Sequence, residues 1–217
     1  MLKSTFELKQ ELKNQSPGLA LDIDETLSRT IDHFIENLFA EFGNPENLTV
    51  AEVINKYRYT HNVPYWQNEE TQAFLEELRN SNELQTRLPL IDGAVETVNK
   101  INEIIPIVAY ITVRPVGVVA GTRKWLNQHG FPKATVIAKP DYVSTLSGNM
   151  WKADVLNYLY PEIMGIVDDN PGIVKSLDKD YQGKIFLYNY PDEVSAKNVY
   201  PCKDWKQVLE TIKKLTG

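Results

Sequence analysis

The chain has 217 residues, of which 42% are hydrophobic and 24% charged, and a net charge of -6 at pH 7. This composition is typical of a soluble globular protein, either one core with an insertion or two small domains. The acidic balance argues against a protein that binds a nucleic-acid polymer through a general basic field.

The cysteine content and the apolar segments bear on the compartment. The single cysteine, Cys202, excludes an internal disulfide and a cysteine-based metal cluster. Residues 1–15 lack the apolar segment of a signal peptide, and the apolar stretch at 104–113 is about half of the ~20 residues that a membrane helix needs. We therefore expect a cytoplasmic protein without a membrane partner, and the sequence does not indicate its oligomeric state.

The first part of the chain predicts one strand and otherwise helices. A short helix containing Phe6, Leu8 and Leu12 should end at the Ser-Pro-Gly segment 16–18. Residues 19–23 are almost all apolar, which is typical of a parallel strand buried on both faces. Residues 30–88 show helical periodicity, a capping-box pattern and no convincing strand. We expect an all-helical cap domain over 30–88, inserted into a core domain built from 1–29 and 89–217.

The second part of the chain alternates amphipathic helical segments with short apolar ones. Strands are expected at 106–112, 135–138, 163–169 and, as the last, 184–188. The alternation predicts an α/β fold, a three-layer Rossmann-like parallel sheet with helices on both faces and the helical cap inserted after the first strand. Ligands of such sheets bind at the carboxyl ends of the strands.

Polar residues that could take part in catalysis or metal binding lie at these strand ends. They are Asp22 and Asp24 on the first strand, Thr112 and Arg114 on the second, and Asp168 and Asp169 on the fourth, with Lys152 in the helix before the fourth strand. Unpaired carboxylates in an apolar environment cost several kcal/mol, so the acids require partners. We expect all these side chains to share one crevice.

The carboxylates predict a metal site. In an extended backbone Asp22 and Asp24 point to the same side. The candidate ligands are Asp22, Asp24, Asp168 and Asp169, a hard all-oxygen set that suits Mg²⁺. Whether Asp168 or Asp169 contacts the metal directly stays open. Because Mg²⁺ in such sites shares its coordination with a phosphate, a small phosphorylated metabolite is the expected partner.

The same residues supply what phosphoryl transfer requires. Asp22 is the candidate nucleophile, because a carboxylate can attack phosphorus and form an aspartyl-phosphate. Asp24 can protonate the leaving oxygen and then activate water. Thr112 can donate a hydrogen bond to the phosphoryl group, and Lys152 can neutralise its charge.

Three roles stay open. Lys139, in the pair Lys139-Pro140, is an alternative to Lys152 as the phosphate-binding lysine. Arg114 is expected to bind the phosphate or the substrate, with a surface ion pair as the alternative. The aromatic residues of the cap either stack on a substrate or form the core of the cap; they are Tyr57, Tyr59, Tyr65 and Trp66.

These motifs, in this order, resemble those of the haloacid dehalogenase (HAD) superfamily of phosphohydrolases. The segment DIDET (22–26) matches D-x-D-x-T, YIT ends at the second-motif Thr112, WKADVL offers the third-motif Lys152, and IVDDN matches the acidic fourth motif. The resemblance covers roughly the whole chain, because the family inserts a cap between the first two motifs. It implies a magnesium-dependent phosphatase that hydrolyses a small phosphate monoester through an aspartyl-phosphate. A phosphotransferase or mutase of the same fold and a non-catalytic metal-binding scaffold are the alternatives.

One stretch is similar to a particular branch of that superfamily. ITVRP (111–115) resembles the T-x-R-P segment of deoxyribonucleotidase-like members, which makes a nucleoside monophosphate a candidate substrate. The chain departs from that branch at Glu25, where those members usually carry glycine.

Overall fold

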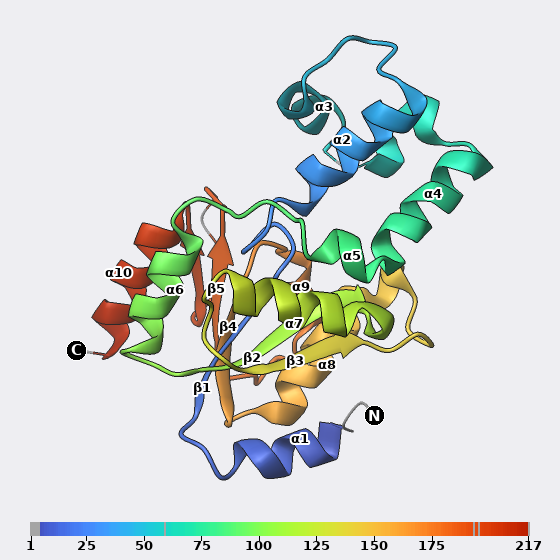
Figure 1. The fold of residues 1–217 in the computed structure, drawn as a ribbon. Helices are drawn as coiled ribbons and strands as arrows, with labels where there is room; N and C mark the ends of the chain where they lie inside the picture. Colours follow the sequence, from blue (N-terminus) through green and yellow to red (C-terminus); the bar gives the residue numbers. More distant parts are fainter. Residues whose placement is uncertain (1–4, 59, 193, 195, 217) are drawn as a thin grey trace.

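A six-stranded parallel sheet forms the centre of the protein, in the strand order β3-β2-β1-β4-β5-β6 (Figure 1). The computed structural model describes residues 5–58, 60–192, 194 and 196–216. The strands are β1 (Gly18–Leu21), β2 (Ile107–Pro115), β3 (Thr135–Lys139), β4 (Ile163–Asp168), β5 (Lys184–Tyr188) and β6 (Val199–Cys202). The predicted α/β fold with a parallel sheet is confirmed.

Helices cover both faces of the sheet and complete three layers. Alternating strand side chains divide the core, because Leu19 and Leu21 face one helix layer and Ala20 faces the other. The first layer contains α6 (Ala94–Asn102), α7 (Val119–Gln128) and α10 (Trp205–Thr216), and the second contains α1 (Thr5–Leu12), α8 (Gly148–Leu159) and α9 (Gly172–Ser176). Among the described residues, no helix is both long and apolar enough to cross a membrane.

The cap is the helical lobe at the top of Figure 1. Over residues 30–88, with residue 59 outside the description, the structure contains helices and turns but no strand. The helices are α2 (Thr30–Phe42), α3 (Val50–Tyr57), α4 (Glu69–Asn80) and α5 (Asn82–Gln85), with short 3-10 helices at Thr60–Asn62 and Pro64–Trp66. The predicted capping box is present, since Thr49 and Glu52 satisfy each other's backbone N–H groups at the start of α3.

The aromatic side chains of the cap pack mainly on one another. Trp66 is fully buried, and its ring centroid lies 5.8 Å from that of Phe39 and 5.3 Å from that of Tyr65. Neither Trp66, Tyr65 nor Tyr57 lines the cavity at the strand ends. Tyr59 lies outside the described residues. For the three described residues, the arrangement favours a cap core over stacking on a substrate.

The sheet extends one strand beyond the sequence-based expectation, so the prediction that β5 is the last strand is wrong. β6 has four residues and includes Pro201, which lacks an N–H donor and is tolerated because β6 is an edge strand. Such a short, proline-containing segment carries little alternation from which a strand can be predicted. The following α10 was also not predicted, although Trp205, Val208 and Ile212 bury one face of it.

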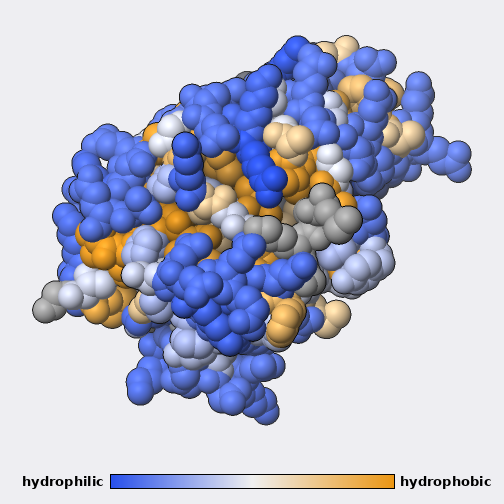
Figure 2. All heavy atoms as spheres, turned by 60° about the horizontal axis from the view of Figure 1, so that its bottom comes forward, coloured by the Kyte–Doolittle hydropathy of each residue, from blue (hydrophilic) through white to orange (hydrophobic). Residues whose placement is uncertain are grey.

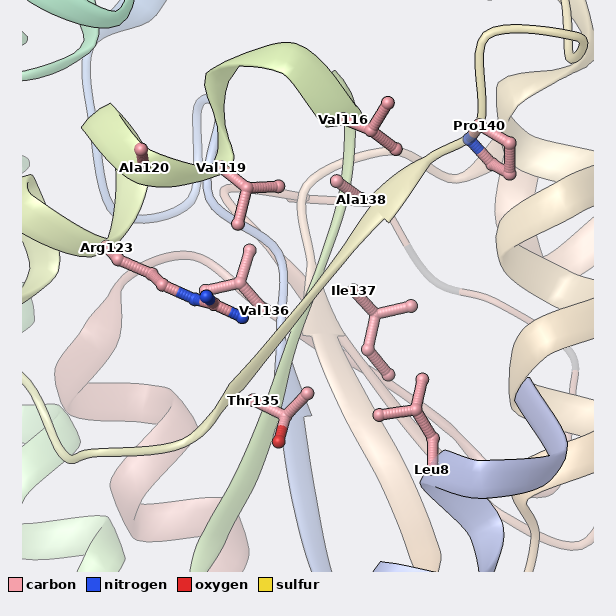
Figure 3. Close-up of a pocket in the computed structure, with 10 residues that line it drawn as sticks. All are labelled: Leu8, Val116, Val119, Ala120, Arg123, Thr135, Val136, Ile137, Ala138 and Pro140. Atoms are coloured by element: carbon pink, nitrogen blue, oxygen red, sulfur yellow. The ribbon is translucent and has the colours of Figure 1, made fainter. Parts of the chain in front are cut away.

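An apolar groove follows the other edge strand, β3 (Figure 3). Leu8 of α1, Val119 of α7 and Ile137 of β3 line this space of about 640 Å³, together with the charged Arg123. Figure 2, a view from below, shows apolar surface between hydrophilic patches. The groove shares no lining residue with the cavity at the strand ends.

Gly121 allows the end of the cap to approach the core closely. Its N–H donates a hydrogen bond to Asn82 Oδ1 at 2.6 Å, and a Cβ on residue 121 would lie 2.3 Å from Asn82 O. We predict that Gly121→Ala lowers the free energy of unfolding by about 1–3 kcal/mol, because the added methyl group overpacks this contact. Denaturant unfolding measures the change.

Gly117→Ala is the matched control, because a Cβ there meets open space. Without the contact to Asn82, Ala in place of Gly121 should stabilise α7 by up to about 1 kcal/mol. A stability of Gly121→Ala equal to or above that of the unsubstituted protein would contradict the proposed packing.

Candidate active site

The turn after β1 begins the site. The N–H of Asp22 donates to Val167 O at 2.9 Å and so continues the pairing of β1 with β4. The N–H groups of Thr26, Leu27 and Ser28 all point to Ile23 O, at 2.8–3.4 Å. The chain therefore turns sharply around the buried Ile23. The side chains of Asp22 and Asp24, on either side of it, point in different directions.

Three carboxylates meet at the carboxyl ends of β1 and β4. Asp22, Asp168 and Asp169 each place one oxygen within 4.8 Å of the others. Lys152, 1% exposed, reaches them from α8, with Nζ 2.9 Å from Asp22 Oδ1 and 2.7 Å from Asp168 Oδ2. Asn170 N donates to Asp168 Oδ1 at 2.9 Å. The structure thus brings together four of the residues that the sequence placed in one crevice.

The electrostatics of this cluster leave negative charge uncompensated. Burial raises the pKa of Asp22 well above its usual range against the opposing charge of Lys152, and Asp168 and Asp169 raise it further. Burial, together with the charge of Asp168, raises the pKa of Asp169 to about 7. Burial alone would lower the pKa of Lys152, but the two carboxylates that it contacts raise it. One ammonium group therefore faces three carboxylates, and this all-oxygen donor set fits a hard divalent cation.

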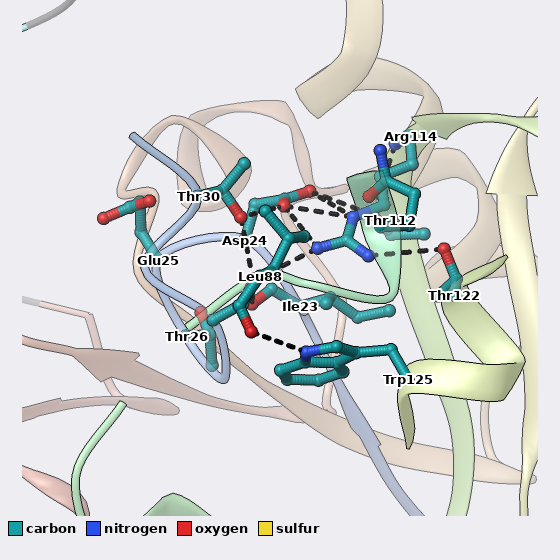
Figure 4. Close-up of polar contacts among 12 residues, drawn as sticks. Ile23, Asp24, Glu25, Thr26, Thr30, Leu88, Thr112, Arg114, Thr122 and Trp125 are labelled. Atoms are coloured by element: carbon teal, nitrogen blue, oxygen red, sulfur yellow. Dashed lines mark hydrogen bonds and ion pairs between the residues drawn. The ribbon is translucent and has the colours of Figure 1, made fainter. Parts of the chain in front are cut away.

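The fourth expected ligand, the side chain of Asp24, lies outside this cluster. It contacts Arg114 and Thr30 instead (Figure 4). Arg114 Nη2 donates to Asp24 Oδ1 at 2.7 Å, Arg114 Nε lies 3.0 Å from both carboxylate oxygens, and Thr30 Oγ1 donates to Asp24 Oδ1 at 2.5 Å. The expectation that Asp22 and Asp24 point to the same side assumed an extended backbone. β1 ends at Leu21, and the turn around Ile23 directs the two carboxylates to different partners.

Arg114 is almost completely buried and lies behind Asp24. Its side chain is 5% exposed and that of Asp24 32%. Arg114 also donates to Thr122 Oγ1 of α7 at 3.3 Å and to Ser28 Oγ at 3.1 Å. Burial alone would raise the pKa of Asp24, but the charge and hydrogen bonds of Arg114 outweigh burial and lower it. The ion pair is therefore partly buried, with Arg114 on its inner side, and is not the surface pair considered from the sequence.

The hydroxyl groups around this ion pair were not identified from the sequence. Ser28, Thr30 and Thr122 contact Arg114 or Asp24 directly, and Thr26 accepts from Asp169 N at 3.2 Å. For Thr26, Ser28 and Thr30, the available signal was the cluster of hydroxyl residues in TLSRT (26–30). Thr122 offered none, because it is one residue of an ordinary helical pattern.

The remaining predicted residues flank the cluster. Thr112 is fully buried at the end of β2, where its Oγ1 accepts from Arg114 N at 3.2 Å and lies 3.5 Å from Asp24 Oδ2. Lys139, at the end of β3, donates to Val143 O at 2.6 Å and to its own neighbour Pro140 O at 3.4 Å. Of the two candidate lysines, Lys152 is the one that contacts the acids.

Glu25 connects the turn to the cap. Its φ of 57° lies in the left-handed region that favours glycine. Its Oε1 accepts from Ile31 N at 2.7 Å and so satisfies one of the free N–H groups at the start of α2. Burial raises the pKa of Glu25 to about 7.

A cavity of about 470 Å³ opens between the strand ends and the cap. Its core side includes Asp22, Asp24, Arg114, Lys139, Lys152 and Asp169, and its cap side includes Phe34, Thr60, Glu76, Arg79, Asn80 and Gln85. The sequence did not identify the cap residues, because helical periodicity shows that a face is buried but not what it faces.

Comparisons with known proteins agree with this geometry at the level of the fold. No protein-family model matches the chain, and no curated protein matches it in sequence. Solved structures do match. A HAD-superfamily hydrolase from Geobacter sulfurreducens has a TM-score of 0.54 at 12% identity, with 91% of this chain and 96% of that chain covered.

Two further structures extend the likeness. A HAD-superfamily hydrolase from Ehrlichia chaffeensis has a TM-score of 0.52 at 14% identity, with 94% of this chain and 100% of that one covered. A HAD-hydrolase from Bacillus subtilis bound to magnesium has a TM-score of 0.51 at 16% identity, with 91% and 99% covered. The chain has the fold of the HAD-superfamily hydrolases.

Proposed function

We propose that this protein is a HAD-type phosphatase that hydrolyses a small phosphate monoester through an aspartyl-phosphate on Asp22, with Mg²⁺ as cofactor. The observation that carries this proposal is the contact of Lys152 with both Asp22 and Asp168, beside Asp169 and beneath the cap. A buried lysine that contacts both a candidate nucleophile and a candidate metal ligand places positive charge where phosphoryl transfer needs it.

In the first step an oxygen of Asp22 forms a bond to phosphorus, and the bond from phosphorus to the leaving oxygen breaks. Asp24, which must first take up a proton against the charge of Arg114, gives that proton to the leaving oxygen. Lys152 and the hydroxyl group of Thr112 stabilise the transferred phosphoryl group. In the second step Asp24 takes a proton from water, which attacks phosphorus and restores the Asp22 carboxylate.

Mg²⁺ would be held by carboxylate oxygens of Asp22, Asp168 and Asp169. Both oxygens of Asp168 already contact protein donors, Lys152 Nζ and Asn170 N. Asp169 has one oxygen engaged, by the hydroxyl group of Thr26 at 3.3 Å. When bound, the ion supplies positive charge that offsets the repulsion between these acids and the substrate phosphate.

The size of the cavity supports a small metabolite as the proposed substrate. A volume of about 470 Å³ lies within the usual range for small-molecule sites. Nucleoside monophosphates remain among the proposed substrates, together with sugar phosphates. The aromatic contact available to a base or sugar ring comes from Phe34, which lines the cavity.

The first prediction from this proposed function concerns the nucleophile. Asp22→Asn should lower the release of inorganic phosphate from p-nitrophenyl phosphate with Mg²⁺ by more than about 10³-fold, because an amide cannot form the covalent intermediate. Asp92→Asn, at a side chain that is 92% exposed, is the control and should keep full activity. Hydrolysis that persists with excess EDTA, or in Asp22→Asn, would refute the proposal. Transfer of phosphate to an added alcohol in place of water would favour the phosphotransferase alternative.

The second prediction separates the two lysines. Lys152→Ala should abolish turnover and lower the free energy of unfolding, since losing one partner of a buried ion pair costs about 3–5 kcal/mol. Lys139→Ala should keep turnover within about tenfold, because Lys139 donates its hydrogen bonds to the backbone carbonyl groups of Pro140 and Val143. Steady-state kinetics and denaturant unfolding of both variants check this. Loss of turnover in Lys139→Ala alone would show that the assignment of Lys152 is wrong.

The third prediction concerns pH and metal. The folded-state pKa values of Asp169 and Glu25, about 7, lie above their unfolded values, so the folded state binds more protons than the unfolded state between about pH 4 and pH 7. Metal-free protein should therefore lose stability as pH rises through 7. The lowered pKa of Asp24 acts in the opposite direction, but only in acid.

Thermal unfolding at pH 5.5 and pH 8, with and without Mg²⁺, tests this dependence. Metal-free Tm should be higher at pH 5.5, and Mg²⁺ should raise Tm more at pH 8, because metal binding requires deprotonated ligands. Asp169→Asn should reduce both differences. A metal-free Tm that rises between pH 5.5 and pH 8 would disagree with the assigned pKa shifts.

A further inference from the structure

We infer that Arg114 is a positioning residue for Asp24 and does not clamp the substrate phosphate. This inference rests on the proposed function, since it assigns how the proton-transferring carboxylate of that reaction is held. It replaces the sequence-based expectation that Arg114 binds the phosphate or the substrate.

The donors of Arg114 are almost all occupied. A guanidinium group has five N–H donors. The Nε–H is shared between the two oxygens of Asp24, the two Nη2 donors bind Asp24 Oδ1 and Ser28 Oγ, and one Nη1 donor binds Thr122 Oγ1. One donor remains, which is too few for the two parallel hydrogen bonds by which arginine holds a phosphate.

The order of the two side chains points the same way. Both Arg114 and Asp24 line the cavity, but the side chain of Asp24 is 32% exposed and that of Arg114 only 5%. A substrate entering the cavity therefore meets the carboxylate first, with the guanidinium group behind it.

The support of Arg114 comes from separate parts of the fold. Its backbone belongs to the end of β2, Thr122 belongs to α7, and Ser28 belongs to the turn after β1. Thr30, the first residue of α2 in the cap, adds a hydrogen bond to the same carboxylate and lies 2.8 Å from Ser28 Oγ. This network fixes Asp24 from the core and from the first turn of the cap.

Positioning and clamping predict different kinetics. If Arg114 acts through Asp24, its loss impairs proton transfer but not the attack of Asp22 on phosphorus. A leaving group of low basicity, such as 2,4-dinitrophenolate, needs no proton to depart. With 2,4-dinitrophenyl phosphate the first step should therefore persist, while attack of water on the aspartyl-phosphate slows.

The test is stopped-flow kinetics of Arg114→Ala with Mg²⁺. We expect a burst of one dinitrophenolate per active site followed by steady turnover reduced about 10²-fold, the usual size of a general acid-base contribution. With an alkyl phosphate both steps slow and no burst forms. A phosphate clamp would instead slow the first step for every substrate and raise KM without a burst, and this result would overturn the inference.

A double-mutant cycle provides the second readout. Arg114→Ala should cost little further activity in an Asp24→Asn background if it acts through Asp24, and its full cost if it contacts phosphate. Thr122→Val serves if Arg114→Ala does not fold, because it removes one support of the guanidinium group at nearly constant volume. This variant should also give a burst followed by reduced steady turnover, with a smaller reduction than in Arg114→Ala. Burst and turnover equal to those of the unsubstituted protein would count against positioning.

The inference and the proposed function fail in different ways. If the unsubstituted protein releases no phosphate, or if Asp22→Asn remains active, the proposed function is wrong whatever Arg114 does. If the unsubstituted protein turns over and Asp22→Asn does not, but the Arg114 and Asp24 effects add fully, the positioning role alone is wrong.

Discussion

The buried contact of Lys152 with Asp22 and Asp168 is the interaction on which the site depends. Three elements far apart in the sequence supply it, the end of β1, the end of β4 and the first turns of α8. Each charged group loses its hydration on burial, and the attraction among them compensates only while all three stay in place. The close packing of α8 on the sheet, with Leu156 and Ala153 fully buried, keeps the ammonium group at that distance. The packing of the core therefore fixes the distances among Lys152, Asp22 and Asp168.

The two acids of the first motif receive opposite environments. Burial and the neighbouring carboxylates of Asp168 and Asp169 raise the pKa of Asp22 in spite of Lys152, whereas the guanidinium group of Arg114 lowers the pKa of Asp24. This division of environments does not by itself give Asp22 the ionised form that a nucleophile needs, so the proposed attack depends on Lys152 and on the charge that a bound Mg²⁺ would add. Here the sharp turn around Ile23 produces the division, because it directs one side chain to Lys152 and the other to Arg114.

Much of this arrangement could be predicted from the sequence, and the remainder depends on information that the sequence does not carry locally. Apolar runs that end in polar residues predict a parallel sheet with a site at its carboxyl edge, and DIDET and IVDDN place Asp22 and Asp168 there. The direction of the Asp24 side chain depends on where β1 ends, and strand ends are poorly defined by periodicity. The partner of Arg114 and the cap residues that face the cavity depend on tertiary packing. β6 was missed because a four-residue edge strand with a proline has almost no pattern.

In the proposed reaction Asp22, beside Lys152, carries the phosphoryl group during turnover. The direct measurement is to mix the protein with Mg²⁺ and a ³²P-labelled monoester, quench in acid within the first turnover, and map the label by peptide mass spectrometry. We expect one acid-stable phosphoryl group per chain, located on Asp22. Label on another residue, or unlabelled protein at a time when phosphate is being released, would contradict it.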